Sequence, residues 1–149
     1  MATISVSAVI LRPVEEVFAY MSDARNNPQW QSSGGLVKIQ QTPESPVGVG
    51  TRIAETRKFM GMTIEDTSEI SEFEPNRKLT RVPVSGKSGP IKRGELTFEP
   101  VAEGCRVTFN GLVEATGLLS IAEPVLLANM KRSFETSLGE AKAHLESQR

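Results

Sequence analysis

The sequence has few of the residues on which metal sites and disulfide-stabilised folds depend. It contains one cysteine, Cys105, which excludes an internal disulfide and a zinc site built from several cysteines. Its single histidine, His144, excludes a histidine-rich metal site and most histidine-based catalytic triads. We therefore expect no metal and no cofactor. Cys105 has only Arg106 as a basic neighbour, so we expect an unreactive thiol.

The sequence also has no large excess of positive or negative charge. The 149 residues include 17 Lys and Arg against 18 Asp and Glu, a formal net charge of −1, with no block of like charges. A chain with this charge balance has no strong positive potential to attract nucleic acid, so we expect no nucleic-acid partner. The first apolar run is interrupted by Arg12 and by Glu15, and no later stretch has the length of a membrane span, so we expect neither a signal peptide nor a transmembrane helix. We predict one cytoplasmic domain, residues 1–149, and leave a homodimer open.

The amino-terminal third reads as a strand, two short helices and a second strand. Residues 3–11 are β-branched and partly alternating, which indicates a strand that ends at Arg12-Pro13. An apolar stripe of one short helix follows: Val14, Val17, Phe18 and Met21. Asp23 can cap a second short helix, which we expect Asn27-Pro28 to break, and residues 36–41 look like a strand.

The rest of the chain is a run of strands closed by one long helix. We place strands near 51–60, 62–73, 78–85, 91–99 and 104–116, separated by Gly, Pro and Asn turns. The helix has a stripe at spacings of 3 and 4: Leu127, Met130, Phe134, Leu138, Ala141 and Leu145. This order predicts an α+β fold, a curled antiparallel sheet with the helix across its concave side. A cavity opens if the short helices hold the long helix away from the sheet at one end.

Four segments resemble the polyketide cyclase/dehydrase branch of the START-related superfamily often called SRPBCC, which has the helix-grip fold. They are Ile10–Tyr20, Asp23–Trp30, Val47–Thr51 and Phe73–Arg77, and the carboxyl-terminal helix resembles that of the family too. The resemblance implies a curved seven-stranded sheet around that helix and a deep cavity for a hydrophobic small molecule. The family includes lipid carriers, hormone binders and aromatic polyketide cyclases, so the fold does not select one activity.

The hairpin around Gly61 carries the most specific local inference. An even-numbered loop pairs odd positions before it with even positions after it, and apolar residues then fall on one face of both strands. That face holds Ile53, Glu55, Arg57, Phe59, Met62, Ile64, Asp66 and Ile70. Glu55 should oppose Asp66, with Arg57 diagonal to it, among residues that face the cavity. Buried charges need partners, so these three form either a structural ion pair, the commoner case, or a site in which Arg57 binds a ligand oxygen and Asp66 or Glu55, with a raised pKa, acts as general acid or base.

The remaining candidates are ligand contacts that core packing would explain equally well. Arg57 aside, the predicted ligand-binding residues are Trp30, Ile53, Phe59, Met62, Ile64, Phe109, Val113, Met130 and Phe134. The facing of Arg81 is undecided, and Asn110 is disfavoured because it alternates with Phe109. We interpret residues 47–50 and 86–90 as loops over the entrance. His144 is expected at a solvated helix end.

Three functions compete. The first is a binding module that holds a lipid-like or polycyclic aromatic molecule for carriage or sensing. The second is an enzyme, a polyketide cyclase or dehydratase that folds a flexible poly-ketone chain into one reactive conformation. The lack of a pocket histidine weakens this second reading. The third, a protein that works through its outer surface, is least favoured because no large exposed apolar patch is evident.

Overall fold

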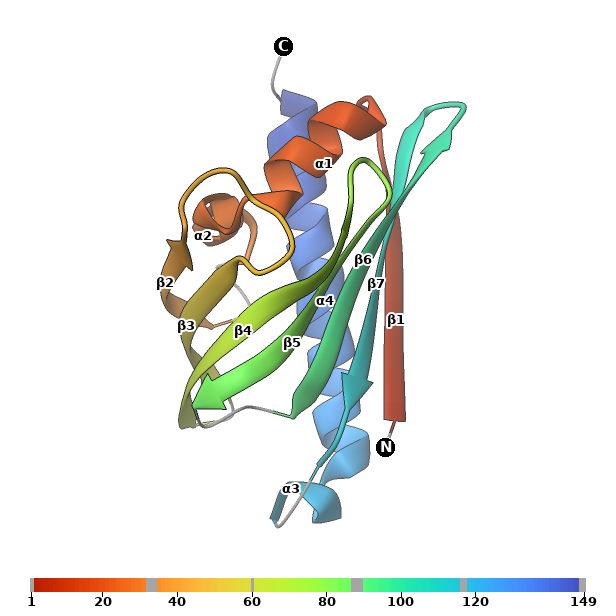
Figure 1. The fold of residues 1–149 in the computed structure, drawn as a ribbon. Helices are drawn as coiled ribbons and strands as arrows, with labels where there is room; N and C mark the ends of the chain where they lie inside the picture. The colour runs from red at the N-terminus through yellow and green to blue at the C-terminus, as the bar shows by residue number, and fades with distance from the viewer. Residues whose placement is uncertain (1, 32–34, 60, 87–89, 116–117, 148–149) are drawn as a thin grey trace.

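In a computed structural model, the chain forms one curved sheet around a long helix (Figure 1). The structure describes residues 2–31, 35–59, 61–86, 90–115 and 118–147. The strands are β1 (Ala2–Ile10), β2 (Leu36–Thr42), β3 (Arg52–Phe59), β4 (Met62–Glu74), β5 (Lys78–Gly86), β6 (Ile91–Val101) and β7 (Gly104–Val113). The helices are α1 (Val14–Ser22), the 3₁₀ turn η1 (Ala24–Asn26), α2 (Asn27–Trp30), α3 (Leu118–Ile121) and α4 (Glu123–Ser147).

The sheet has seven strands in the order β1-β7-β6-β5-β4-β3-β2, and neighbouring strands are antiparallel. The sheet therefore runs sequentially from β2 to β7, and β1 closes it beside β7. Figure 1 shows its strands curving around α4, with α1 and α2 lying near one end of that helix. This is the helix-grip arrangement that the sequence predicted, an α+β fold with two short helices after the first strand.

The short helices follow from local sequence signals, with one correction. Pro13 precedes α1, and Glu15 and Glu16 occupy its first turn, where the helix dipole favours acidic residues. The Asp23 carboxylate accepts a hydrogen bond from the backbone N–H of Arg25 and so caps η1, as predicted. The helix that Asp23 caps ends at Asn26, immediately before Asn27-Pro28, as predicted. The correction is that Asn27-Pro28 also begins α2, with Pro28 in the first turn, where the backbone N–H that proline lacks would have no helical acceptor.

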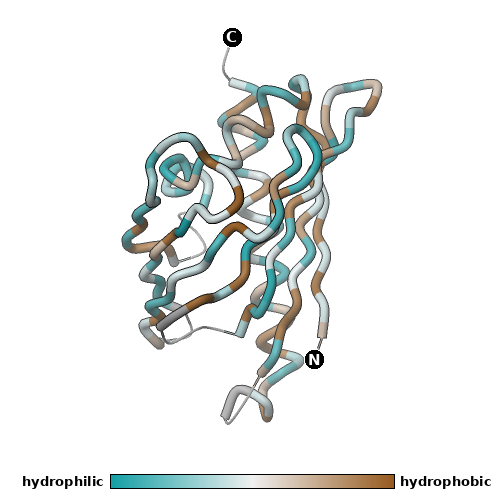
Figure 2. The backbone as a smooth tube through the Cα atoms, viewed as in Figure 1, coloured by the Kyte–Doolittle hydropathy of each residue, from teal (hydrophilic) through white to brown (hydrophobic). Residues whose placement is uncertain are grey.

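The core lies between the concave face of the sheet, α1 and α4. A main cluster of buried side chains joins β1, β6 and β7 to both helices, and it includes Ile10, Val17, Phe98 and Leu138. A second cluster, Ala24, Ile53, Ile70 and Leu79, lies under η1. The hydropathy colours of Figure 2 show apolar and polar positions alternating along strands of the sheet, which is typical of a sheet with one buried face.

The register of β3 against β4 is the one that the Gly61 hairpin predicted. Glu55 pairs with Asp66, Arg57 with Ile64, and Phe59 with Met62. The pairing of β4 with β5 is less regular, because its register shifts between Thr67 and Ser68 and again between Ile70 and Glu72. Pairing with Ile70 then places Arg81 on the concave face of β5. Among the described residues, no helix combines the length and apolar character needed to cross a bilayer.

Candidate functional site

A cavity of about 200 Å³ opens between the concave face of the sheet, α2 and α4. The sheet supplies side chains from β3 to β7, and α4 supplies the residues that face them. Most of the lining is apolar: Trp30, Ile64, Leu79, Pro83, Pro90, Ile91, Leu96, Phe109, Met130, Phe134 and Leu138. The core therefore contains an unfilled space here, which the prediction of a small-molecule site requires.

Charged groups gather on the part of the wall formed by β3, β4 and β5. The Glu55 carboxylate accepts Arg57 Nη2 on Oε2 at 2.7 Å and Arg81 Nη2 on Oε1 at 2.8 Å. Ser68 Oγ accepts Arg81 Nε at 2.9 Å and Arg81 Nη2 at 2.7 Å. Glu55 thus joins two guanidinium groups from different strands, and Asp66, its cross-strand neighbour, also lines the cavity.

The end of α2 is tied to the same group. Gln31, the buried residue that follows α2, accepts a hydrogen bond on Oε1 from Arg57 Nη2. Its own backbone N–H donates to the Asn27 carbonyl at 2.7 Å, so the final turn of α2 fixes the position of the amide side chain. Arg57 therefore connects the short helix to β3 across the cavity wall.

These contacts determine the ionisation of Glu55. Burial by itself raises the pKa of Glu55, but the positive charges of Arg81 and Arg57 and their hydrogen bonds outweigh burial and lower the pKa to about 2. The hypothesis of a general acid or base required a raised pKa, whereas the pKa of Glu55 is lowered. This carboxylate is ionised at neutral pH, and its role on the wall is to balance charge.

Two aromatic side chains connect sheet and helix beside the polar wall. Phe109 in β7 and Phe134 in α4 stack with ring centroids 3.9 Å apart and planes inclined by 14°. Trp30 at the end of α2 is 3% exposed and belongs to the main buried cluster while also lining the cavity. Both interpretations of Trp30, as an anchor of α2 and as a wall of the pocket, therefore describe the same side chain.

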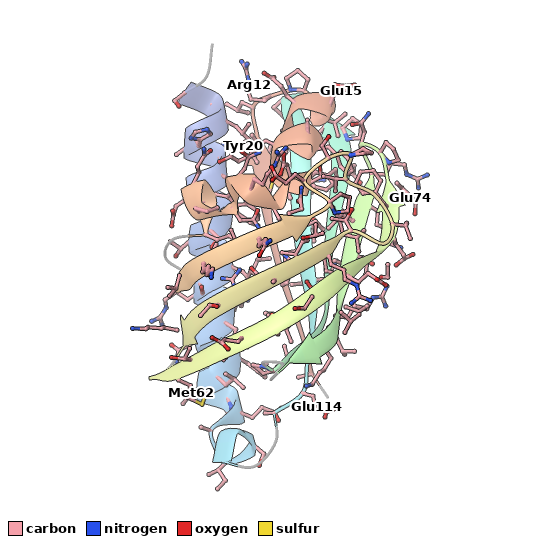
Figure 3. All side chains as sticks on the ribbon, turned by 60° about the vertical axis from the view of Figure 1, so that its left-hand side comes forward. Arg12, Glu15, Tyr20, Met62, Glu74 and Glu114 are labelled. Atoms are coloured by element: carbon pink, nitrogen blue, oxygen red, sulfur yellow. The ribbon has the colours of Figure 1, made fainter. Side chains whose placement is uncertain are left out.

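The structure brings most of the predicted residues to the cavity. Its lining includes eight of them: Trp30, Glu55, Arg57, Ile64, Asp66, Phe109, Met130 and Phe134. Ile53 and Val113 do not line it, because they are 2% and 1% exposed and pack in the two buried clusters. Met62 does not line it either. Its side chain is 39% exposed. Figure 3 shows Met62 at the opposite end of the sheet from Tyr20. The side chain of Phe59 lies outside the described part of the chain.

Several lining residues were undecided or missed. Arg81 lines the cavity, whereas Asn110 does not, as its alternation with Phe109 indicated. Gln31, Ser68 and Ser137 gave no signal, because small polar residues are equally typical of turns, strand surfaces and helix surfaces. Within the predicted entrance loop at 86–90, residues 87–89 lie outside the described residues.

The predicted loop over the entrance at residues 47–50 has another role. Gly50 N–H donates to the Ile70 carbonyl, and Gly48 N–H donates to Thr51 Oγ1, so this turn is fastened to β4. None of its residues lines the cavity. Val47 instead packs against the buried cluster under η1.

His144 and Cys105, the single histidine and the single cysteine of the sequence, do not line the cavity. His144 was expected at a solvated helix end, but its ring stacks on Tyr20 at a centroid distance of 4.9 Å. Cys105 is a buried free thiol whose pKa is raised, mainly by burial, in agreement with the prediction that it is unreactive. Within the residues that the structure describes, no group of three or more His, Cys, Asp or Glu side chains could hold a metal ion.

Comparisons with known proteins place this geometry in a family. A family model described as polyketide cyclase/dehydrase and lipid transport matches residues 1–146. No curated protein matches the sequence.

Solved structures with the same fold cover nearly the whole chain. TTHA0849 from Thermus thermophilus is 17% identical, with a TM-score of 0.82 over 99% of this chain and 100% of that one. The ZhuI aromatase/cyclase from Streptomyces sp. R1128 is 14% identical, with a TM-score of 0.75 over 97% of this chain and 93% of that one. Ms6760 from Mycobacterium smegmatis is 15% identical, with a TM-score of 0.72 over 99% and 92%. At these identities the likeness establishes the fold alone.

Proposed function

The chain belongs to the polyketide cyclase/dehydrase and lipid transport family, and from this premise we propose that it binds a small hydrophobic molecule in the cavity between the sheet and α4, for carriage or sensing. The observation that carries the proposal is the hollow itself, about 200 Å³ of space with a mostly apolar lining in a chain of 149 residues. A lipid-like or polycyclic aromatic molecule would fill it and remove apolar surface from water. The proposal includes a cytoplasmic location.

The arrangement of the wall supports one orientation of such a ligand. Apolar side chains of β6, β7 and α4 would surround its hydrocarbon part, while the charged group on β3, β4 and β5 would face any oxygen it carries. A few fixed polar groups in an apolar pocket are typical of sites that select orientation as well as size. This is why we favour a specific small molecule over a general surfactant-like binder.

The first test is native mass spectrometry of the purified protein, followed by titration with a neutral apolar dye. Trp30 is the only tryptophan in the sequence, so its emission reports directly on the cavity wall. We expect saturable binding with a change in Trp30 fluorescence. A protein that carries no small molecule and gives no saturable signal with any apolar dye would contradict the proposal.

A cavity-filling variant sharpens this test. Ser133 lines the cavity from α4, so Ser133→Phe places a ring in the space that the ligand would occupy. Ala128 is on the same helix and does not line the cavity, so Ala128→Phe is the matched control. We expect the first substitution to abolish dye binding in a folded protein and the second to leave binding intact. Equal binding by both variants would locate the dye outside the cavity.

A second function, cyclisation of a poly-ketone chain, is favoured by one observation. Asp66 places a carboxylate on the cavity wall, in β4, directly across from Glu55 and its two arginines. A carboxylate beside cationic donors could move a proton while an enolate oxygen is held. The measurement is product formation from a poly-β-ketone intermediate by the natural protein and by Asp66→Asn. Equal rates would remove Asp66 from any mechanism.

A further inference from the structure

Arg81 has one end of its guanidinium fixed and the other end open. Nε and Nη2 donate to Ser68 Oγ, and Nη2 also donates to the Glu55 carboxylate. With the described residues, Nη1 makes no hydrogen bond and no ion pair. Three contacts therefore hold the plane of the guanidinium in place and leave the N–H donors of Nη1 unused by them.

The open nitrogen is not enclosed by protein. Among the described residues, the buried side-chain polar atoms that lack a partner are Arg12 Nε, Asn27 Oδ1, Trp30 Nε1 and Thr80 Oγ1. Arg81 Nη1 is not among them, and the Arg81 side chain is 20% exposed, so the guanidinium borders accessible space. Because Arg81 lines the cavity, this space is where a bound molecule would lie.

Arg57, which the sequence favoured as the ligand contact, is held differently. Its Nη2 donates both to Gln31 at the end of α2 and to Glu55, so this nitrogen joins a helix to the sheet. These contacts are those of a residue that positions α2 and the carboxylate. The two arginines share Glu55, but Arg57 is also bound to Gln31 at the end of α2, whereas Arg81 is also bound to Ser68 in β4.

The formal charges of the wall indicate what kind of oxygen fits. Two guanidiniums, Arg57 and Arg81, and two carboxyl groups, Glu55 and Asp66, line this part of the cavity, so their formal charges sum to zero. Arg93 also lines the cavity, but its Nη2 pairs with Glu72 and Glu95, and its side chain is 48% exposed. An added ligand carboxylate would compete with Glu55 for Arg81 and would make the formal charge of these four residues and the ligand negative in a mostly apolar cavity, which is costly. A neutral oxygen acceptor adds no charge.

We propose that Arg81 Nη1 is the polar contact for the ligand and that the ligand presents an uncharged oxygen acceptor, such as a ketone or ester carbonyl, on an apolar body. This inference rests on the proposed binding function. It assigns the selective contact to β5 and leaves Arg57 as a positioning residue.

The experiment compares three probes of nearly equal shape by titration of Trp30 fluorescence or by calorimetry. They are 2-acetylnaphthalene, a ketone; 2-isopropenylnaphthalene, the hydrocarbon of the same shape; and 2-naphthoate, the carboxylate. A hydrogen bond to a charged donor is worth about tenfold or more in affinity. We therefore expect the natural protein to bind the ketone about tenfold more tightly than either other probe.

Two double variants test which arginine is responsible while keeping the charge balance of the wall. Arg81→Met with Glu55→Gln removes the open guanidinium, and Arg57→Met with Glu55→Gln removes the other. We expect the first variant to bind ketone and hydrocarbon equally and the second to keep the preference for the ketone. Arg81→Lys and Arg57→Lys, which retain charge, provide the same comparison if a double variant does not fold.

The outcomes separate this inference from the function on which it rests. Saturable binding of the hydrocarbon without a preference for the ketone would support the cavity function and overturn the role of Arg81. Loss of preference in both double variants would show that the group acts as a whole and overturn the assignment to one residue. Tightest binding of 2-naphthoate would overturn the uncharged class. Binding of no probe would count against the proposed function itself.

Discussion

The ring of Phe109 lies over Gly111, two residues further along β7. A Cβ atom at Gly111 would stand 2.9 Å from Phe109 Cε2, closer than such atoms come in proteins. Gly94, which pairs with Gly111 from β6, would place its Cβ 3.3 Å from Phe109 Cε1. Phe134 stacks on the same ring from α4. Two neighbouring positions without side chains therefore let the ring lie against the sheet and set the spacing of sheet and helix at this wall.

Gly111→Ala should displace Phe109 and disturb the cavity. The new methyl group also meets Ile4 Cγ1 at 3.2 Å, so little room exists on either side. We expect a loss of about 1–3 kcal/mol in the free energy of unfolding, typical of an overpacked core, and weaker binding of apolar dyes. Urea unfolding and dye titration measure the two effects. Gly48→Ala is the control, since nothing lies within 4 Å of its Cβ. An unchanged Gly111→Ala protein would show that the Phe109 ring moves freely.

Phe134→Ala should enlarge the cavity at a cost in stability. It removes one ring of the stacked pair from a half-buried position, so we expect a loss of about 2 kcal/mol in the free energy of unfolding. The added space should admit probes larger than those that the natural protein binds. Phe134→Leu is the matched variant, with a smaller loss and little added space. If Phe134→Ala binds the same range of probe sizes as the natural protein, this ring does not limit the cavity.

The fold could be read from the sequence because its turns are marked by Gly, Pro and Asn and its faces by simple periods. The predicted strand at 62–73 and the observed β4, Met62–Glu74, differ by one residue. The long helix was found from its apolar stripe, although the buried Leu126 beside it was missed. The break at Asn27-Pro28 was predicted, but the start of α2 at the same place was not, because proline can end one helix and begin another and local sequence does not distinguish the two cases.

Only the part of the site that follows from the alternation of side chains along strands could be predicted. The parity of the Gly61 loop placed Glu55, Arg57 and Asp66 on one face, and the pairing of β3 with β4 agrees. Alternation identifies the buried face but not how far along it a cavity extends, so it grouped Ile53 and Val113 with residues that line the cavity, although these two do not. Arg81 was left undecided because the turn at Pro75 could hold three or four residues. The register shift between Ile70 and Glu72, which lies between this turn and Arg81, adds an irregularity that alternation does not predict.

Tyr20 should titrate at unusually high pH. Burial raises its pKa to about 12 from an ordinary value of 10, and the hydroxyl donates to Gln29 Oε1 at 2.9 Å. Since the sequence has one tyrosine, ultraviolet absorbance near 295 nm follows this group alone. We expect the stability associated with neutral Tyr20 to be present below pH 10 and to be lost as pH rises through about 12.

His144→Ala provides the comparison, because it removes the ring stacked on Tyr20 and exposes the phenol to water. Its effect on α4 should be small, since the position lies in the last turn. We expect the Tyr20 pKa to move back toward 10 in this variant. A natural protein whose tyrosine already ionises at 10 would show that the stacked pair opens in solution.

The ion pairs of Glu55 should make the free energy of unfolding depend on pH in the acid range. The folded pKa of about 2 lies below the ordinary value of 4.5, so the contribution is fully present above pH 4.5 and is lost as pH falls through about 2. A shift of this size in a side chain that is 9% exposed corresponds to about 3 kcal/mol. Urea unfolding at pH values from about 7 down to about 2.5 measures most of this loss of stability.

Glu55→Gln should remove this dependence and lower stability at neutral pH by about 3 kcal/mol, because it leaves two part-buried guanidiniums without their shared anion. The matched control is Glu69→Gln, which breaks the more exposed pair with Arg52 between β3 and β4 and should cost less than about 1 kcal/mol. The free energy difference between the natural protein and Glu55→Gln should therefore shrink as pH falls below 4.5, whereas the difference for Glu69→Gln stays small throughout. A gap for Glu55→Gln that is the same at pH 3 and pH 7 would show that acid does not act through this carboxylate, and that packing of the side chain accounts for the loss.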